Sequence, residues 1–193
     1  MTYLTRFKPS RVAWRLAAAA AVAGAAAIAA GPGNAAPAGA TDASYPPPRA
    51  GFERPKLRHG VLTIKGTTAS DKISLRLKAG EPGILQIDVG DDGSADFQFK
   101  RKKIARIAVA ARSGDDLVRI DELNGLVTDG IATTIDGGVG NDTLLGGSRA
   151  ETLLGGDGAD SIDGNGGNDA SQLGAGDDTF IWDPGDGSDT LEG

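Results

Sequence analysis

The sequence is notable first for what it lacks. Its 193 residues include no cysteine, one histidine and only 5% aromatic residues. Without cysteine the chain forms no disulfide, no thiolate zinc site and no cysteine nucleophile. The single histidine, His59, excludes any metal site or mechanism that needs two imidazoles from one chain. The small aromatic content leaves aliphatic side chains to form most of any core.

Charges of both signs are present, but they are unevenly placed. The 26 acidic and 20 basic residues give a net charge of −6. Twelve of the acids, a single base (Arg149) and 16 of the 30 glycines lie in residues 137–193, which therefore carry −11. Such a segment repels phosphates, so we expect no nucleic-acid partner. Dense carboxylates among glycines indicate a hard cation instead.

The N-terminal 40 residues resemble an export signal. They contain four bases and no acid, followed by an apolar stretch over residues 16–30 and then small residues and proline. This order is typical of a secretory signal peptide, and the apolar stretch is shorter than the roughly 20 residues of a membrane span. We therefore expect a cleaved signal peptide over residues 1–40 and an extracellular protein with no stable membrane insertion; a signal anchor is the alternative.

Residues 41–136 divide into a linker and a β-rich part. Four prolines in residues 41–56 predict an extended linker. Alternating apolar residues then predict strands at 61–64, 73–77, 84–89, 96–99 and 104–109. We expect residues 57–136 to be either a separate β-rich region or the N-terminal cap of the glycine-rich segment at 137–193.

Two motifs in this part allow two interpretations each. Residues 88–96 place acids like a calcium-binding loop, but Gly90 and Phe99 stand where that loop needs ligands. Asp-Gly between strands also signals a hairpin turn, which we favour. The basic run at residues 100–103 could attract an acidic surface polymer, although a charged strand edge is the simpler interpretation.

A nine-residue repeat fills the rest of the chain. Residues 137–145 match Gly-Gly-x-Gly-x-Asp-x-U-x at every specified place, where U is a large apolar residue, and residues 155–163 match it again. Imperfect copies occupy residues 146–154, 164–172, 173–181 and, after an insertion at 182–183, 184–192. A degenerate copy lies upstream at 111–119. The strict register and the apolar residue at every ninth place argue against a flexible glycine-rich linker.

These nonapeptides resemble those of the repeats-in-toxin (RTX) calcium-binding proteins, the haemolysin-type family. The resemblance covers residues 137–193 well, residues 111–119 weakly and the rest not at all. It implies an all-β fold with a C-terminal parallel β-roll of 18 residues per coil. It also implies Ca²⁺ as the bound cofactor, held between loops 18 residues apart by aspartate carboxylates and main-chain carbonyls.

Carried over to this sequence, the resemblance places the ligands on two edges of the roll. On the first edge lie loops 137–142, 155–160 and 173–178, where we expect two ions. On the second edge lie loops 146–151, 164–169 and 184–189, where Arg149, the longer Glu151 and the insertion predict weaker or no binding. The expected carboxylate ligands are Asp142, Asp160, Asp178, Asp169 and Asp189, with Glu151 doubtful, and the expected carbonyl ligands are Gly138, Gly140, Gly156, Gly158, Gly174 and Gly176.

Few apolar residues and many acids suggest that the roll folds only when calcium binds. The sequence stops at Gly193, the first place of a further repeat, so we expect a roll truncated at its C-terminus.

The sequence favours a secreted calcium-binding protein with a structural or adhesive role. It has neither a His-Glu-x-x-His zinc motif nor a Gly-x-Ser-x-Gly nucleophile motif, so we expect no enzyme activity. The many acids leave a carboxylate-pair hydrolase open. The alternative function is the non-catalytic portion of a secreted hydrolase of the protease or lipase type.

Overall fold

The computed structural model describes residues 51–193, so the expected signal peptide lies outside the described residues. Residues 51–193 belong to one compact unit. The described residues contain β-strands and one 3-10 turn but no α-helix. The elements are β1 Lys56–Arg58, β2 Val61–Lys65, β3 Lys72–Lys78, β4 Glu81–Val89, β5 Phe97–Lys100, η1 Arg101–Lys103, β6 Arg106–Ser113, β7 Leu117–Asp121, β8 Ala132–Val139, β9 Thr143–Leu145, β10 Glu151–Asp157, β11 Ser161–Asp163, β12 Ala170–Ala175, β13 Thr179–Ile181 and β14 Thr190–Glu192.

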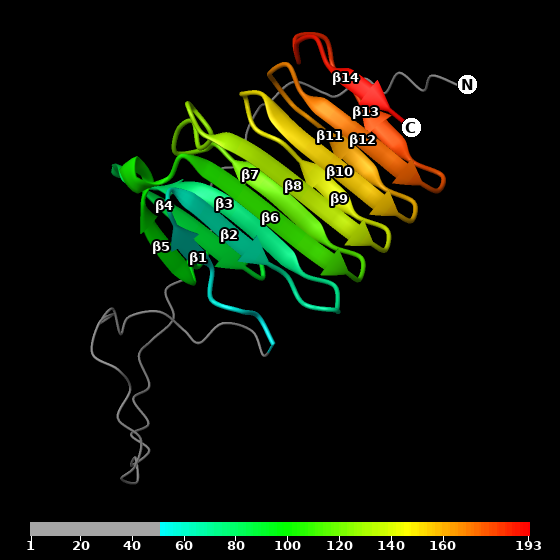
Figure 1. Cartoon of the computed structure of the whole chain (residues 1–193). Coiled ribbons are helices and arrows are strands. Elements are labelled where there is room, and N and C mark those ends of the chain that lie inside the picture. The colour runs from blue at the N-terminus through cyan, green and yellow to red at the C-terminus, as the bar shows by residue number, and fades with distance from the viewer. Residues whose placement is uncertain (1–50) are drawn as a thin grey trace, which may run out of the picture. The chain divides into compact units, whose positions relative to one another are not determined.

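The strands form two seven-stranded sheets, and from β2 onward the chain winds between them as a solenoid (Figure 1). Sheet A has the order β1-β2-β6-β8-β10-β12-β14, and sheet B has the order β13-β11-β9-β7-β3-β4-β5. Strands of successive coils pair in parallel, whereas β1, β4 and β5 add antiparallel pairs at one end. The fold is therefore all-β with a parallel β-roll, as predicted.

The coils differ in length along the solenoid. Equivalent positions in neighbouring coils are 18 residues apart in the repeat segment, which confirms the predicted period there. Upstream the spacing is 26 residues where a longer segment joins β7 to β8, and 45 residues in the first coil, where β4, β5 and η1 are inserted. The insertion at residues 182–183 lengthens the last spacing to 20 residues.

The core is thick at the N-terminal end and thins toward the C-terminus. Alternating residues of β2, β3, β4 and β6 point inward, because successive side chains of a strand face opposite sides. In the repeat segment only the apolar residue of each nonapeptide fills the core, and Leu144, Leu153 and Ile162 are fully buried. Phe180 is only half-buried, and Leu191 is 49% exposed. The last coils therefore contribute little hydrophobic stabilisation.

The sheets continue without a break from the β-rich part into the repeats. Strand β8 runs from Ala132 to Val139 and pairs with β6 on one side and β10 on the other. At the opposite end Phe52, in the range expected to be a linker, is buried and stacks on Phe97 at 6.3 Å between ring centroids. Among residues 51–193 no helix is both long enough and apolar enough to span a membrane.

Candidate metal centre

The turns that lead from sheet A to sheet B stack along one edge of the solenoid. Each nonapeptide turn of this edge has positive φ at its second and fourth places, as at Gly138 (+103°) and Gly140 (+131°). Glycine adopts these angles without the steric cost that a side chain brings. The turn conformation therefore explains why glycine recurs at these two places.

Close stacking also requires glycine at these places. A Cβ on Gly156 would collide with the carbonyl oxygen of Gly138, and a Cβ on Gly174 would collide with that of Gly156. The fourth-place glycines meet the carbonyl of the preceding coil in the same way. Backbone oxygens thus line the stack densely, and the six expected carbonyl ligands all lie in it: Gly138, Gly140, Gly156, Gly158, Gly174 and Gly176.

The sixth-place aspartates form a continuous row beside these oxygens, which we name the first carboxylate ladder. In each step a carboxylate Oδ1 accepts a hydrogen bond from the backbone N–H of the aspartate one coil earlier. The N–H of Asp142 donates to Asp160 at 2.8 Å, and the N–H of Asp160 donates to Asp178 at 2.9 Å. The structure therefore brings the three predicted aspartates of this edge together. The full ladder is Asp71, Asp116, Asp142, Asp160 and Asp178.

The second oxygen of several of these carboxylates is buried without a partner. Oδ2 of Asp116, Asp142 and Asp160 is shielded from solvent and accepts no hydrogen bond. Burial raises the pKa of all three carboxyls, that of Asp116 to about 7. Burying a carboxylate oxygen without a hydrogen-bond donor costs free energy. A bound cation that contacts the oxygen is one explanation for its burial.

Carbonyl oxygens converge on the same places. The space that a Cβ of Gly155 would fill lies against Asp160 Oδ2 and the carbonyl oxygen of Leu173. The equivalent space at Gly137 lies against Asp142 Oδ2 and, at 2.8 Å, the carbonyl oxygen of Gly155. Carboxylate and carbonyl oxygens are the ligands that Ca²⁺ prefers. The donor set therefore fits a hard cation.

The opposite edge carries a second, shorter row, which we name the second carboxylate ladder. It consists of Glu151, Asp169 and Asp189, joined by backbone N–H donors at 2.7 and 2.9 Å. Asp169 Oδ2 is buried without a partner, and burial raises the pKa of this carboxyl to about 6. This edge therefore also presents one unpartnered oxygen.

Glu151 differs from the aspartates because both of its oxygens are satisfied. Oε1 accepts from the hydroxyl of Thr128 at 2.7 Å, and Oε2 accepts from the N–H of Gly147 at 2.9 Å. Burial nevertheless raises the pKa of this carboxyl to about 7. In the same loop Arg149 pairs with Asp129 at 3.0 Å. This part of the second edge is thus closed by contacts within the protein.

The first ladder extends upstream of the repeats. Asp116 belongs to the degenerate copy, whereas Asp71 was not singled out from the sequence. A signal for it exists: Gly66 precedes Asp71 by five residues and Ile73 follows by two, the spacing of the first, sixth and eighth places of the nonapeptide. Asp71 Oδ2 accepts from the N–H of Thr67 at 2.6 Å. The ladder therefore begins with a carboxylate whose Oδ2 accepts a hydrogen bond within the protein, unlike the Oδ2 atoms that follow it in Asp116, Asp142 and Asp160.

The other acid-rich segment, residues 88–96, is a turn between β4 and β5. Asp88 is fully buried and pairs with Arg76 at 2.7 Å, while its carboxylate also accepts from the N–H of Gly93. Asp91 binds Arg119 through both oxygens. These acids are engaged within the protein, which supports the turn interpretation of this segment.

No group of three or more histidine, cysteine, aspartate or glutamate side chains within residues 51–193 could hold a metal ion. A site on the first ladder would therefore use two carboxylates at most, with main-chain oxygens as the remaining ligands. Backbone carbonyls are regular Ca²⁺ ligands but poor ligands for softer metals.

Comparison with protein families matches residues 134–148 and 145–180 to the RTX calcium-binding nonapeptide repeat, in four copies. The match confirms the resemblance seen in the sequence, and these repeats bind Ca²⁺. No curated protein and no solved structure matches the chain.

Proposed function

Because residues 134–180 are RTX calcium-binding nonapeptide repeats, we propose that the chain is a secreted calcium-binding protein whose C-terminal coils fold and stiffen when Ca²⁺ binds. Its role is structural or adhesive, and it has no catalytic activity of its own. The export pattern of residues 1–40 supports secretion, which brings the protein to a calcium-rich medium.

One observation carries this proposal: the row of buried, unpartnered Oδ2 atoms on the first carboxylate ladder. A calcium ion neutralises the carboxylates with its two positive charges. It also accepts lone pairs from the Oδ2 atoms that have no hydrogen-bond donor. Asp142 and Asp160 then provide oxygens to one ion, and Asp160 and Asp178 to a second. Carbonyls of the glycines at the second and fourth places complete the ligand set.

The coupling of folding to calcium follows from the balance of forces in the repeat segment. Asp142 and Asp160 are 1–2% exposed, and each carries an unpartnered oxygen. Neighbouring carboxylates of the ladder also repel one another. Against these costs the nonapeptides fully bury only Leu144, Leu153 and Ile162, each of which contributes about 1.5–3 kcal/mol. The conformational entropy lost when nine residues become ordered costs more free energy than this. Folding of these coils therefore depends on the free energy of cation binding.

Calorimetric titration of Ca²⁺ into the full chain, compared with Asp160→Asn, tests the proposal. Asp160 lies in the middle loop of the first edge, so its substitution removes a ligand from both ions on that edge. We expect saturable binding by the wild type, accompanied by a gain of β signal in circular dichroism. Both should be strongly reduced in the variant.

The matched control is Asp92→Asn, which removes one exposed acid from the turn at residues 88–96. This variant should bind calcium as the wild type does. Loss of binding in Asp92→Asn but not in Asp160→Asn would move the metal to that turn and overturn the proposal. A circular dichroism spectrum that is the same in chelator and in excess Ca²⁺ would refute the coupling of folding to calcium.

A further inference from the structure

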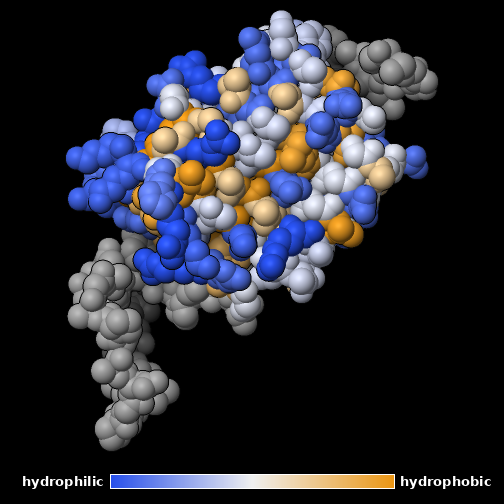
Figure 2. Space-filling model, viewed as in Figure 1, coloured by the Kyte–Doolittle hydropathy of each residue, from blue (hydrophilic) through white to orange (hydrophobic). Residues whose placement is uncertain are grey.

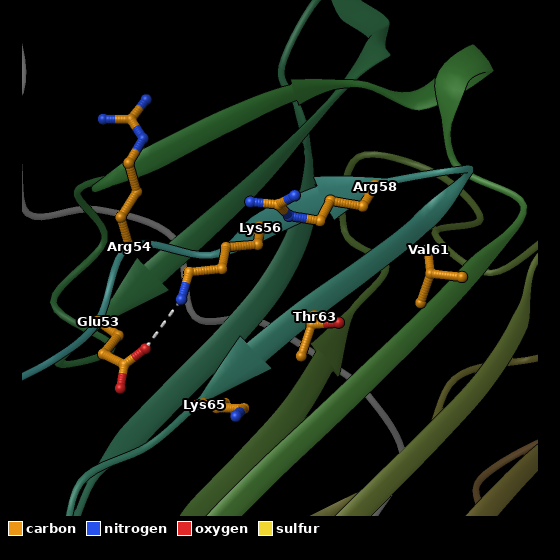
Figure 3. A pocket seen from close by; sticks show the side chains of 7 residues that line it. All are labelled: Glu53, Arg54, Lys56, Arg58, Val61, Thr63 and Lys65. Atoms are coloured by element: carbon orange, nitrogen blue, oxygen red, sulfur yellow. Dashed lines mark hydrogen bonds and ion pairs between the residues drawn. The ribbon is translucent and has the colours of Figure 1, made fainter.

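The outer face of sheet A carries a shallow groove of about 250 Å³ at the end of the solenoid opposite the repeats. Strand β1 and the neighbouring β2 form most of it (Figure 3). Their antiparallel pairing places Lys56 beside Thr63 and Arg58 beside Val61. The lining residues, which we name the basic groove, are Glu53, Arg54, Lys56, Arg58, Val61, Thr63 and Lys65.

Strand alternation explains why these cations point outward together. Leu62 and Ile64 of β2 are fully buried, so Thr63 and Lys65 face the opposite side of the sheet. In β1, Lys56 and Arg58 flank Leu57, which packs against the core. The charged ends of these side chains lie outside the core, so they are accessible to a ligand.

The charges of the groove are poorly neutralised by the protein. Its single acid, Glu53, pairs with Lys56 at 3.3 Å, and both side chains are more than half exposed. Arg54 lies over the ring of Phe97 at 5.6 Å, which holds its side chain without cancelling its charge. No carboxylate of the described residues pairs with Arg58 or Lys65.

Further cations extend the positive surface around the end of the solenoid. The carbonyl of Gly60, in the β1–β2 turn, accepts hydrogen bonds from the N–H groups of Ala105 and Arg106, so η1 lies next to this turn. Lys102 and Lys103 of η1 are exposed. Figure 2 shows hydrophilic residues gathered at this end of the face. The positive surface is therefore longer than the groove alone.

The arrangement favours an extended polyanion over a small anion. The cations are exposed and spread over two strands, and an exposed ion pair contributes only about 0.2–1 kcal/mol. A single carboxylate or phosphate would gain too little binding free energy from one such ion pair to bind stably. A polymer with a charge on successive units engages several cations at once, and its contacts reinforce one another.

We propose that the basic groove binds an acidic polysaccharide, a linear polymer that carries uronate carboxylates. Arg58 can hold a carboxylate through two parallel hydrogen bonds, whereas Lys56 and Lys65 act as point charges. The half-buried Val61 and Thr63 line the same groove and offer methyl groups and a hydroxyl to a sugar ring. The proposal is independent of calcium binding, because no residue of the groove belongs to either carboxylate ladder.

Other polyanions fit this surface less well. The large exposed apolar side chains of residues 51–193 are Leu123, Leu126, Val139, Trp182 and Leu191, and none of them lies in the groove to enter a lipid layer. A long duplex nucleic acid would also face the acidic repeat segment, which carries −11. An acidic polysaccharide is flexible and can avoid that segment.

Fluorescence anisotropy with a labelled hyaluronan oligosaccharide, a uronate polymer, tests the proposal on the full chain in calcium-containing buffer. We expect saturable binding that weakens steeply as salt is added. Arg58→Gln/Lys65→Gln should weaken it on the order of tenfold, because two exposed ion pairs are lost. The control, Lys72→Gln, removes one exposed lysine of β3, which lies in sheet B and outside the positive surface, and should change affinity less than about twofold.

Several outcomes would overturn the proposal. These are equal losses in Arg58→Gln/Lys65→Gln and in the Lys72→Gln control, binding that salt does not weaken, and equal binding of neutral dextran. Tighter binding of duplex DNA or of vesicles containing phosphatidylserine would assign the groove to a different ligand. Because the repeats are intact in both variants, unchanged calorimetric calcium binding separates a failure here from a failure of the proposed function.

Discussion

The two halves of the solenoid share one fold but differ in what stabilises it. Residues 51–136 contain most of the buried apolar side chains, whereas only Leu144, Leu153 and Ile162 are buried apolar residues beyond residue 136. Both halves bury acids, but in the second half they outnumber the buried apolar side chains: Asp142, Glu151, Asp160, Asp163 and Asp169. Hydrophobic burial is intrinsic to the chain, whereas the stability of buried carboxylates depends on their ionic surroundings.

Strand pairing alone is therefore not enough to stabilise the solenoid. Parallel pairing is continuous along sheet A from β2 to β14. Hydrophobic burial stabilises its first strands, whereas its last strands bury little apolar surface. We expect the first half to be a calcium-independent platform and the second half a calcium-dependent extension. Chelation, amino-acid substitution and a change of pH each test this difference between the two halves.

Removal of calcium has the largest expected effect. In chelator, backbone amides of β9 to β13 should exchange with solvent far faster than in calcium, because the buried acids lose their counter-charge. Amides of β2, β3 and β6 should keep their protection. Hydrogen exchange read by mass spectrometry measures both halves at once. Equal loss of protection in the two halves would show that they fold as one unit.

Substitution of Gly156 by alanine should be the most damaging single change in the repeats. Its φ is +114°, and a Cβ there would collide with the carbonyl oxygen of Gly138. We expect a loss of about 3 kcal/mol or more in the free energy of unfolding, measured by urea denaturation in calcium.

The matched control is Gly80→Ala, in the turn between β3 and β4. Its φ is +75°, but no atom lies within 4 Å of the new Cβ, so backbone strain of about 1 kcal/mol is the only cost. Similar losses in the two variants would show that tight stacking contributes nothing at Gly156.

The pH dependence of the first half should depend on Asp116. Burial raises the pKa of this carboxyl to about 7, above its value in the unfolded chain. The protonated form favours folding, so its stabilisation is complete below the unfolded pKa and is lost as the pH rises through about 7. In chelator the melting temperature of the first half should therefore be higher at pH 6 than at pH 8. Asp116→Asn should flatten this slope, and an unchanged slope would exclude Asp116 as its source.

Arg112→Gly has the smallest expected effect. Arg112 stands at the second place of the degenerate copy with a φ of +90°, where the repeats have glycine. The substitution relieves backbone strain but loses a long hydrogen bond of 3.3 Å to the carbonyl of Gly66. We expect a gain of about 1 kcal/mol in stability by chemical denaturation. A clear loss would show that the arginine side chain stabilises the turn by more than its strain costs.

The sequence predicted the strands of the first half but not how they pair. The alternation at Val61–Lys65 and Lys72–Lys78 is visible in the residues. Their parallel partners, β6 and β7, begin 45 residues downstream, beyond the inserted β4 and β5. Local periodicity carries no information about pairing across such an insertion. The spacing of Gly66, Asp71 and Ile73 is a local signal for a repeat turn, but only the pairing across the insertion places Asp71 beside Asp116 in the first carboxylate ladder.

The sequence by itself determined the repeat: an 18-residue coil, glycine at the tight turns and an acid at the sixth place. These features are local, since each nonapeptide encodes its own turn and strand. Only the tertiary structure decided which oxygens remain without partners. Glu151 is satisfied by Thr128, 23 residues away, whereas the Oδ2 atoms of Asp142 and Asp160 are not satisfied. The unpartnered oxygens depend on how neighbouring coils stack, because the one hydrogen bond that each of these carboxylates accepts comes from the preceding coil.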